Sequence, residues 1–316
     1  MNVFASELCE AISRPIFLRG PRMSDQLFCI IDVPILAAFK PEGPHNSMIP
    51  MPAAGKSPWK FFSLVFVISV PFWLVGTVVN HFLPKAIAIN LPFAAMMFVC
   101  PAAVALYLSY QENGSKGTAQ LLKKTFDYPK IKQKIWYIPI LLFWPLVMIL
   151  AYLWMKFTGY ALPSLHYPDW LAPVSLVLFF IAAAGEELGW MGFAIDPLQE
   201  RWSALGAAII LGAVWAILHI IPYIQAHQTA NWIFWQCLAT MATRIIMVWL
   251  YNNTGKSVFA AILFHAIYNT ITLVFPNYGF IFNPFIYFVL IAVSAAIVMF
   301  LWGPGTMTHN RYARYM

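Results

Sequence analysis

Eight apolar runs, each long enough to cross a bilayer, constrain most strongly what this chain of 316 residues can fold into. About 20 apolar residues in an α-helix cover the roughly 30 Å of hydrocarbon in a membrane. Apolar residues make up 61% of the chain and charged residues 10%, against roughly 25% charged in soluble domains. The runs are continuous and not alternating, which argues against a barrel. We therefore expect an all-α, polytopic membrane bundle with about eight transmembrane helices, at residues 60–80, 86–110, 136–157, 171–195, 203–221, 232–251, 257–275 and 284–302.

The positions of lysine and arginine predict how these helices are oriented. Six lysines fall in the loop 111–135, namely Lys116, Lys123, Lys124, Lys130, Lys132 and Lys134. Because positive charge marks cytoplasmic loops, this loop should be cytoplasmic, and alternation places both termini on the same side. We expect a multi-pass protein of a bacterial plasma membrane. The net charge of +7 reflects this asymmetry and calls for a lipid bilayer, not a nucleic acid, as partner.

The two ends of the chain differ from its apolar centre. Residues 1–55 carry several arginines, one weak apolar stretch and a proline-rich segment. We expect a poorly structured extension there, or a translation start placed too early. Residues 56–303 should form the bundle, with a motif-bearing core at 171–275, and residues 304–316 should form a basic cytoplasmic tail.

Two adjacent carboxylates, Glu186 and Glu187, lie inside the run 171–195, which holds no other charge. One ionised side chain at bilayer depth costs roughly 2.5 to 3.5 kcal/mol on insertion scales. A single buried acid is often neutralised by a proton or a partner, but two together favour a functional role. Adjacent residues point about 100° apart around a helix, so one should act and the other should support a neighbouring helix.

Three more polar residues, His219, His265 and Asn269, fall in runs that are otherwise apolar. His265 and Asn269 are four residues apart, as are Trp215 and His219, so each pair shares one helix face. Such a set can hydrolyse a peptide bond. A carboxylate can take a proton from water, histidines can position that water or bind a metal, and an amide can stabilise an oxyanion.

Three segments in this order resemble the CAAX protease and bacteriocin-processing enzyme (CPBP) family of intramembrane peptidases, which includes the Ras-converting CAAX endopeptidase. They are EELGWMGFAIDPLQ (186–199), WAILH (215–219) and HAIYN (265–269), and the resemblance covers about residues 171–275.

The resemblance implies a role for each of these positions. Glu186 would be the base that activates water, and Glu187 would support it. His219 and His265 would bind water, or would hold a metal such as zinc together with Glu186. Asn269 would stabilise the oxyanion or position a partner, with Trp190 and Trp215 in supporting roles.

One position departs from the family pattern, which often has an arginine where this chain has Met191. Arg244 is the one arginine in the middle of a predicted span, and an intramembrane arginine is expected to find an acid. We predict that Arg244 pairs with Glu187. The alternative is that Arg244 binds a carboxylate of the substrate.

The leading hypothesis is thus an intramembrane endopeptidase, either metal-dependent or glutamate-type, acting on a peptide or protein substrate that is lipidated or membrane-embedded. The alternatives are a non-proteolytic scaffold or bacteriocin-immunity-type protein, and a proton-coupled transporter. Counting from the predicted span ends, His219 lies about 10 Å deeper than Glu186 at 1.5 Å per residue. A bend near Gly189 or Gly192 would reduce this mismatch.

Overall fold

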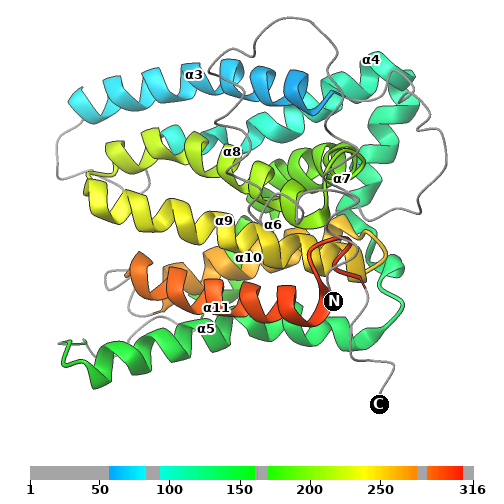
Figure 1. The fold of residues 1–316 in the computed structure, drawn as a ribbon. Helices are drawn as coiled ribbons and strands as arrows, with labels where there is room; N and C mark the ends of the chain where they lie inside the picture. The colour runs from blue at the N-terminus through cyan, green and yellow to red at the C-terminus, as the bar shows by residue number, and fades with distance from the viewer. Residues whose placement is uncertain (1–56, 83–92, 161, 163–169, 276–282, 309–316) are drawn as a thin grey trace, which may run out of the picture. The chain divides into compact units, whose positions relative to one another are not determined.

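The computed structural model describes residues 57–82, 93–160, 162, 170–275 and 283–308, and this part of the chain is helical without any strand (Figure 1). Within these residues eight helices form the bundle, and a five-residue helix, α7, prolongs one of them. The long helices are α3 (Pro58–Phe82), α4 (Val99–Lys123), α5 (Tyr137–Phe157), α6 (Leu171–Gly189), α8 (Ala204–Gln225), α9 (Ala230–Asn253), α10 (Val258–Val274) and α11 (Pro284–Trp302). A π-helix (Trp190–Ala194) joins α6 to α7 (Ile195–Gln199).

Seven helical stretches in the described residues are long and apolar enough to cross a membrane. The eighth, α10, has 17 residues and is also apolar. Each predicted span thus has a helix, and the prediction of an all-α membrane bundle is confirmed. The expected extension at 1–55 and residues 309–316 of the tail lie outside the described residues. Residues 304–308 are described, and there Ala204 donates its backbone N–H to the carbonyl of Gly305 at 2.6 Å.

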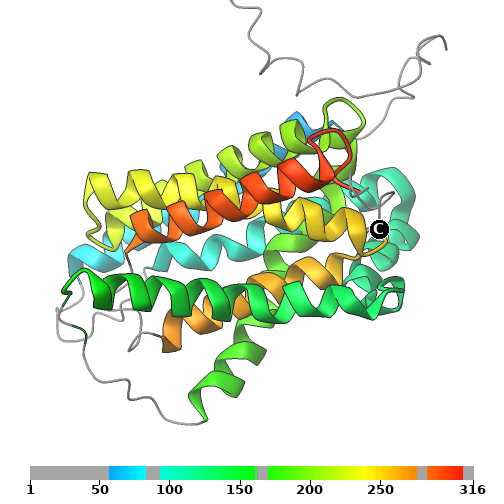
Figure 2. The ribbon, with the colours of Figure 1, turned by 60° about the horizontal axis from the view of Figure 1, so that its bottom comes forward.

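The helix α6 lies between α4 on one side and α10 on the other. The helix α9 packs between α8 and α11, as both views show (Figures 1 and 2). The helix α10 also contacts α5 and α9. The motif-bearing helices α6, α8, α9 and α10 therefore meet near the centre of the bundle, where polar side chains from all four can touch.

Two glycines flank the glutamate pair in the sequence GEELG and bring α4 close to α6. A Cβ on Gly189 would lie 2.6 Å from the Pro101 backbone, and one on Gly185 would lie 3.0 Å from Phe98. Small residues four apart let membrane helices approach closely. The first turn of α4 and the 3₁₀ turn before it (Phe93–Phe98) therefore lie close to the part of α6 that carries the glutamate pair.

The prediction of a loop at 111–135 was wrong for its first half, because α4 continues to Lys123. The helix breaks at Asn113 and at Gly114, whose φ is +59°, and then resumes in a new direction. Lysine content had suggested a loop, but Gly117 and Leu121 lie four residues apart and are buried, which gives this stretch a helix face to pack. Three 3₁₀ turns follow (Lys124–Phe126, Tyr128–Lys130 and Lys134–Trp136).

Candidate active site

The glutamate pair lies at the end of α6, directly before the π-helix Trp190–Ala194. A π-helix changes the helical pitch and is frequent at functional sites. Lys124 donates from Nζ to the carbonyl oxygen of Gly192 at 2.6 Å, within the π-helix. The π-helix lies where the sequence predicted a bend, near Gly189 and Gly192.

Glu187 is fully buried, and both of its carboxylate oxygens are bonded. Oε2 pairs with Nη1 of Arg244 at 2.7 Å, and both side chains are 0% exposed. Oε1 accepts from Nδ1 of His265 at 2.9 Å. The predicted Arg244–Glu187 pair is therefore confirmed, with α9 supplying the arginine.

Arg244 also contacts an aromatic ring. Its guanidinium lies 4.1 Å from the centre of the Trp215 ring. Among the described residues, its Nε and Nη2 atoms have no hydrogen-bond partner. Stacking on a tryptophan face stabilises such a desolvated cation. The contact with Trp215 therefore offsets part of the free-energy cost of burying Nε and Nη2 without hydrogen bonds.

Glu186 has a different environment from Glu187. Its Oε2 accepts a hydrogen bond from Nε1 of Trp215 at 2.7 Å, and the residue is 7% exposed. It pairs with none of the cations in the described part of the chain. The Glu186 side chain also lines a small pocket. One carboxylate oxygen is therefore held by Trp215, and the carboxylate can contact a molecule in the pocket.

Both histidines use Nδ1 as a donor. In His219, Nδ1 lies 2.8 Å from the carbonyl oxygen of Trp215, which can only accept. In His265, Nδ1 bonds the Glu187 carboxylate, which also accepts. In its neutral form, each imidazole therefore has its lone pair on Nε2, as a water-positioning or metal-binding histidine does. The Trp215 ring contacts both, with its centre 5.7 Å from that of the His219 ring and 5.3 Å from that of the His265 ring.

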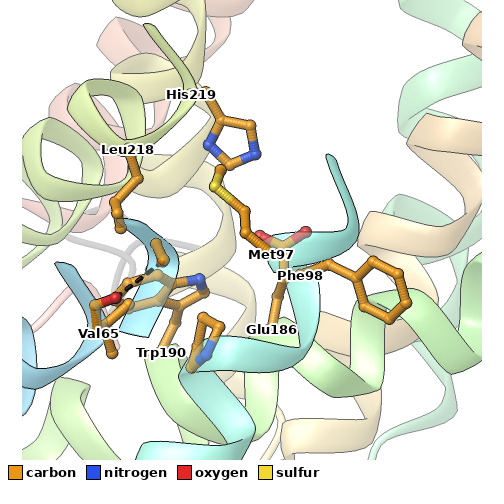
Figure 3. Close-up of a pocket in the computed structure, with 9 residues that line it drawn as sticks. Val65, Met97, Phe98, Glu186, Trp190, Leu218 and His219 are labelled. Carbon is orange, nitrogen blue, oxygen red and sulfur yellow. Dashed lines mark hydrogen bonds between the residues drawn. The ribbon is translucent and has the colours of Figure 1, made fainter. Parts of the chain in front are cut away.

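A pocket of about 10 Å³ brings Glu186 and His219 together (Figure 3). On this measure one water molecule needs roughly 10–15 Å³, so the pocket is about the size of one water. It is lined by Val65, Ser69, Met97, Phe98, Pro101, Glu186, Trp190, Leu218 and His219. The depth mismatch predicted between Glu186 and His219 is accommodated, because Glu186 bonds Trp215, one turn before His219 on α8.

Of the other predicted residues, His265 and Asn269 do not line this pocket, whereas Trp190 does. His265 is 4% exposed and connects to it through Glu187 and Trp215. Asn269 is half-buried one turn beyond His265 and has no hydrogen bond to the other site residues. Trp190 is buried, lines the pocket and packs edge-on against Phe61.

Sequence reasoning missed the pocket wall formed by α3 and the start of α4. Its residues are apolar apart from Ser69, so no polar signal marked them. The spacing of Gly185 and Gly189 was the available sign that another helix approaches the carboxylates closely.

The candidate metal ligands do not come together as a group. His219, His265 and Glu186 were the predicted ligands, but within the described residues no three His, Cys, Asp or Glu side chains form a group that could hold a metal ion. As arranged, these residues do not fit a zinc ion, which needs three protein ligands at about 2.0–2.2 Å.

Comparison with known proteins agrees with the motifs and their geometry. A family model described as type II CAAX prenyl endopeptidase Rce1-like matches residues 168–271, which contain Glu186, Glu187, His219, Arg244, His265 and Asn269. Over these residues the chain is similar to this Rce1-like family. It is also similar to CAAX prenyl protease 2 of Methanococcus maripaludis, with 26% identity over 229 residues, covering 67% of this chain and 83% of that protein. Both matches agree with the resemblance seen in the motifs, and the helices make the chain a multi-pass membrane protein.

Proposed function

We propose that this Rce1-like protein hydrolyses a peptide bond of a membrane-associated protein, with Glu186 as the general base. The observation that supports this most strongly is that the two glutamates have different hydrogen-bond partners. Both oxygens of Glu187 are bonded to Arg244 and His265, whereas Glu186 faces a pocket that has room for about one water molecule.

The proposed reaction starts with a water molecule between Glu186 and His219. The lone pair on Nε2 of His219 can accept from this water and orient it, because Nδ1 is engaged with the Trp215 carbonyl. Glu186 takes one proton as the water oxygen bonds to the peptide carbonyl carbon. The C–N bond then breaks, and the same proton passes from Glu186 to the leaving amine.

Glu187 acts in this scheme by holding its neighbours. Its bond to Nδ1 of His265 fixes the ring of that histidine, and its bond to Arg244 keeps the carboxylate oriented. Asn269 lies one turn beyond His265 on α10. We assign its amide the role of donor to the carbonyl oxygen as charge develops there.

The substrate is proposed to be presented at the membrane. The relative in Methanococcus maripaludis is named a CAAX prenyl protease, so a prenylated peptide ending in a CAAX sequence is the first substrate to test. An unprenylated peptide tests whether the prenyl group is needed. A transmembrane peptide tests whether the substrate is embedded in the membrane.

The test compares Glu186→Gln with the unmodified protein in liposomes, using quenched fluorescent peptides of these three kinds. General acid–base catalysis contributes roughly 10²–10⁴-fold, so we expect Glu186→Gln to lower kcat by at least about a hundredfold without changing thermal unfolding. Glu200→Gln, at an exposed acid beyond α7, is the matched control and should retain full activity. Retention of cleavage by Glu186→Gln would rule out this base, and failure of every peptide to be cleaved would favour a scaffold function.

A further inference from the structure

The stretch after the break in α4 lies across the bundle instead of along it. Beyond Gly114 the chain runs at one end of the bundle, roughly perpendicular to the other helices, until α5 begins (Figures 1 and 2). We name residues 115–136 the crossing segment. A helix that lies parallel to a membrane surface, and not through it, takes this orientation.

The crossing segment has one face against the bundle and one face outward. Gly117, Leu121 and Ile131 are buried. Large apolar side chains point outward beside charged ones: Leu122 is 47% exposed, Phe126 63%, Tyr128 52% and Ile135 61%. Five lysines are exposed among them, and four of these, at positions 116, 123, 132 and 134, are outside the ion pair that Lys130 makes with Asp127. Lysines interleaved with exposed apolar groups are typical of segments in the headgroup layer.

The positive charge of this segment is not balanced within the described structure. It contains six lysines and one acid, Asp127. Asp127 is already engaged, because it pairs with Lys130 at 2.9 Å and accepts from Ser257 Oγ at 2.9 Å. None of the ion pairs within the described ranges uses Lys116, Lys123, Lys132 or Lys134.

We propose that the crossing segment binds the headgroups of anionic phospholipids in the leaflet that it faces. The apolar side chains would enter the upper acyl region, and the lysine ammonium groups would contact lipid phosphates. Clusters of four to eight basic residues directly beside a transmembrane helix attract anionic lipids in this way. The proposal holds for either orientation of the protein in the membrane.

The bound lipid would also stabilise the helices that carry the candidate site. Lys124 in the crossing segment bonds the Gly192 carbonyl in the π-helix after Glu187. Asp127 accepts from the backbone N–H of Phe259 at 3.0 Å, at the start of the helix that carries His265. Because the segment contacts both helices, ordering it should raise the stability of the whole bundle.

The test measures thermal unfolding of the purified protein in neutral detergent with added phosphatidylglycerol or phosphatidylcholine. Phosphatidylglycerol should raise Tm by several degrees, and phosphatidylcholine should have little effect. The variant with glutamine at positions 116, 123, 132 and 134 should bind phosphatidylglycerol roughly 10- to 100-fold more weakly. The variant with arginine at the same positions keeps the charge and should behave like the unmodified protein.

Several outcomes would overturn the proposal. Equal stabilisation by both lipids, or an undiminished response of the glutamine variant, would exclude an anionic lipid site here. An equal shift with inorganic phosphate would assign the site to a free anion. If the glutamine variant does not fold, the unmodified protein decides the matter, since its response to phosphatidylglycerol must fall as salt screens the charges. Peptide cleavage is not measured, so this result is separate from that of the proposed activity.

Discussion

Glu186 and Glu187 differ in how many of their oxygens are occupied. The side chain of Glu187 meets an arginine and a histidine from two other helices, while that of Glu186 meets one indole N–H. Adjacent positions on α6 point in different directions, so each carboxylate reaches a different set of neighbours. The two residues are chemically identical, so their different proposed roles come from the different helices that they face.

Arg244→Met should destabilise the protein strongly, because it leaves Glu187 buried without its counter-charge. Breaking a buried ion pair by removing one partner costs about 3–5 kcal/mol, and both side chains here are 0% exposed. The measurement is the free energy of unfolding in mild detergent. Arg201→Gln, at an exposed arginine, is the control and should change it little.

The double variant Glu187→Met, Arg244→Met tests whether the instability of Arg244→Met comes from leaving one buried charge without its partner. Replacing both charges by apolar groups is often close to neutral, so the double variant should be more stable than Arg244→Met alone. It should nevertheless lose the proposed peptidase activity, because His265 no longer has its carboxylate partner. If the single and double variants are equally unstable, the unpaired charge of Glu187 is not what destabilises Arg244→Met.

At the scale of elements, α6 depends on contact with α4 through Gly189. A Cβ at this position would lie 2.6 Å from Pro101 backbone atoms, which cannot move without displacing α4. Gly189→Ala should therefore cost about 1–3 kcal/mol, the usual penalty of overpacking, and should lower activity by shifting the pocket wall.

Gly192→Ala, three residues later in the same stretch, is the matched control. Its Cβ would meet the flexible end of the Leu121 side chain at 3.1 Å. Thermal unfolding should show a smaller loss than for Gly189→Ala. If the two variants lose the same stability, close helix approach at Gly189 is not what limits the substitution.

The helices were predictable from the sequence where apolar runs are long, and less so where charge and burial mix. The stretch 111–123 was assigned to a loop because its lysines hide the buried positions of Gly117 and Leu121. The Arg244–Glu187 pair was predictable, since these residues are opposite charges in apolar spans and each needs a partner. The bond from Trp215 to Glu186 was not, because spacing gives the face of a helix but not the side chain that meets it.

The whole molecule places its lysine-rich stretch at one end of the bundle. Whether this end faces the cytoplasm, with both termini beside it, stays a prediction from charge asymmetry. Labelling of single cysteines at positions 132 and 156 with a membrane-impermeant reagent in intact cells would decide it. Position 132 should react only after the cells are opened.

Metal content is a second property of the whole protein that the candidate site makes testable. Because the predicted ligands do not form a three-residue group, we expect purified protein to contain well under one zinc ion per chain. Peptide cleavage should survive a strong chelator. One zinc per chain, with activity lost on chelation and restored by zinc, would show that the site rearranges to bind a metal.

The ion pair of Glu187 and Arg244 also has a consequence for how the protein is made. The two residues are 57 positions apart in the chain, and ribosomes add roughly 5–20 residues per second. Glu187 therefore leaves the ribosome roughly 3–11 s before its partner. Until α9 arrives, α6 carries two acids without the arginine, so its stable integration into the bilayer must wait for a helix synthesised later.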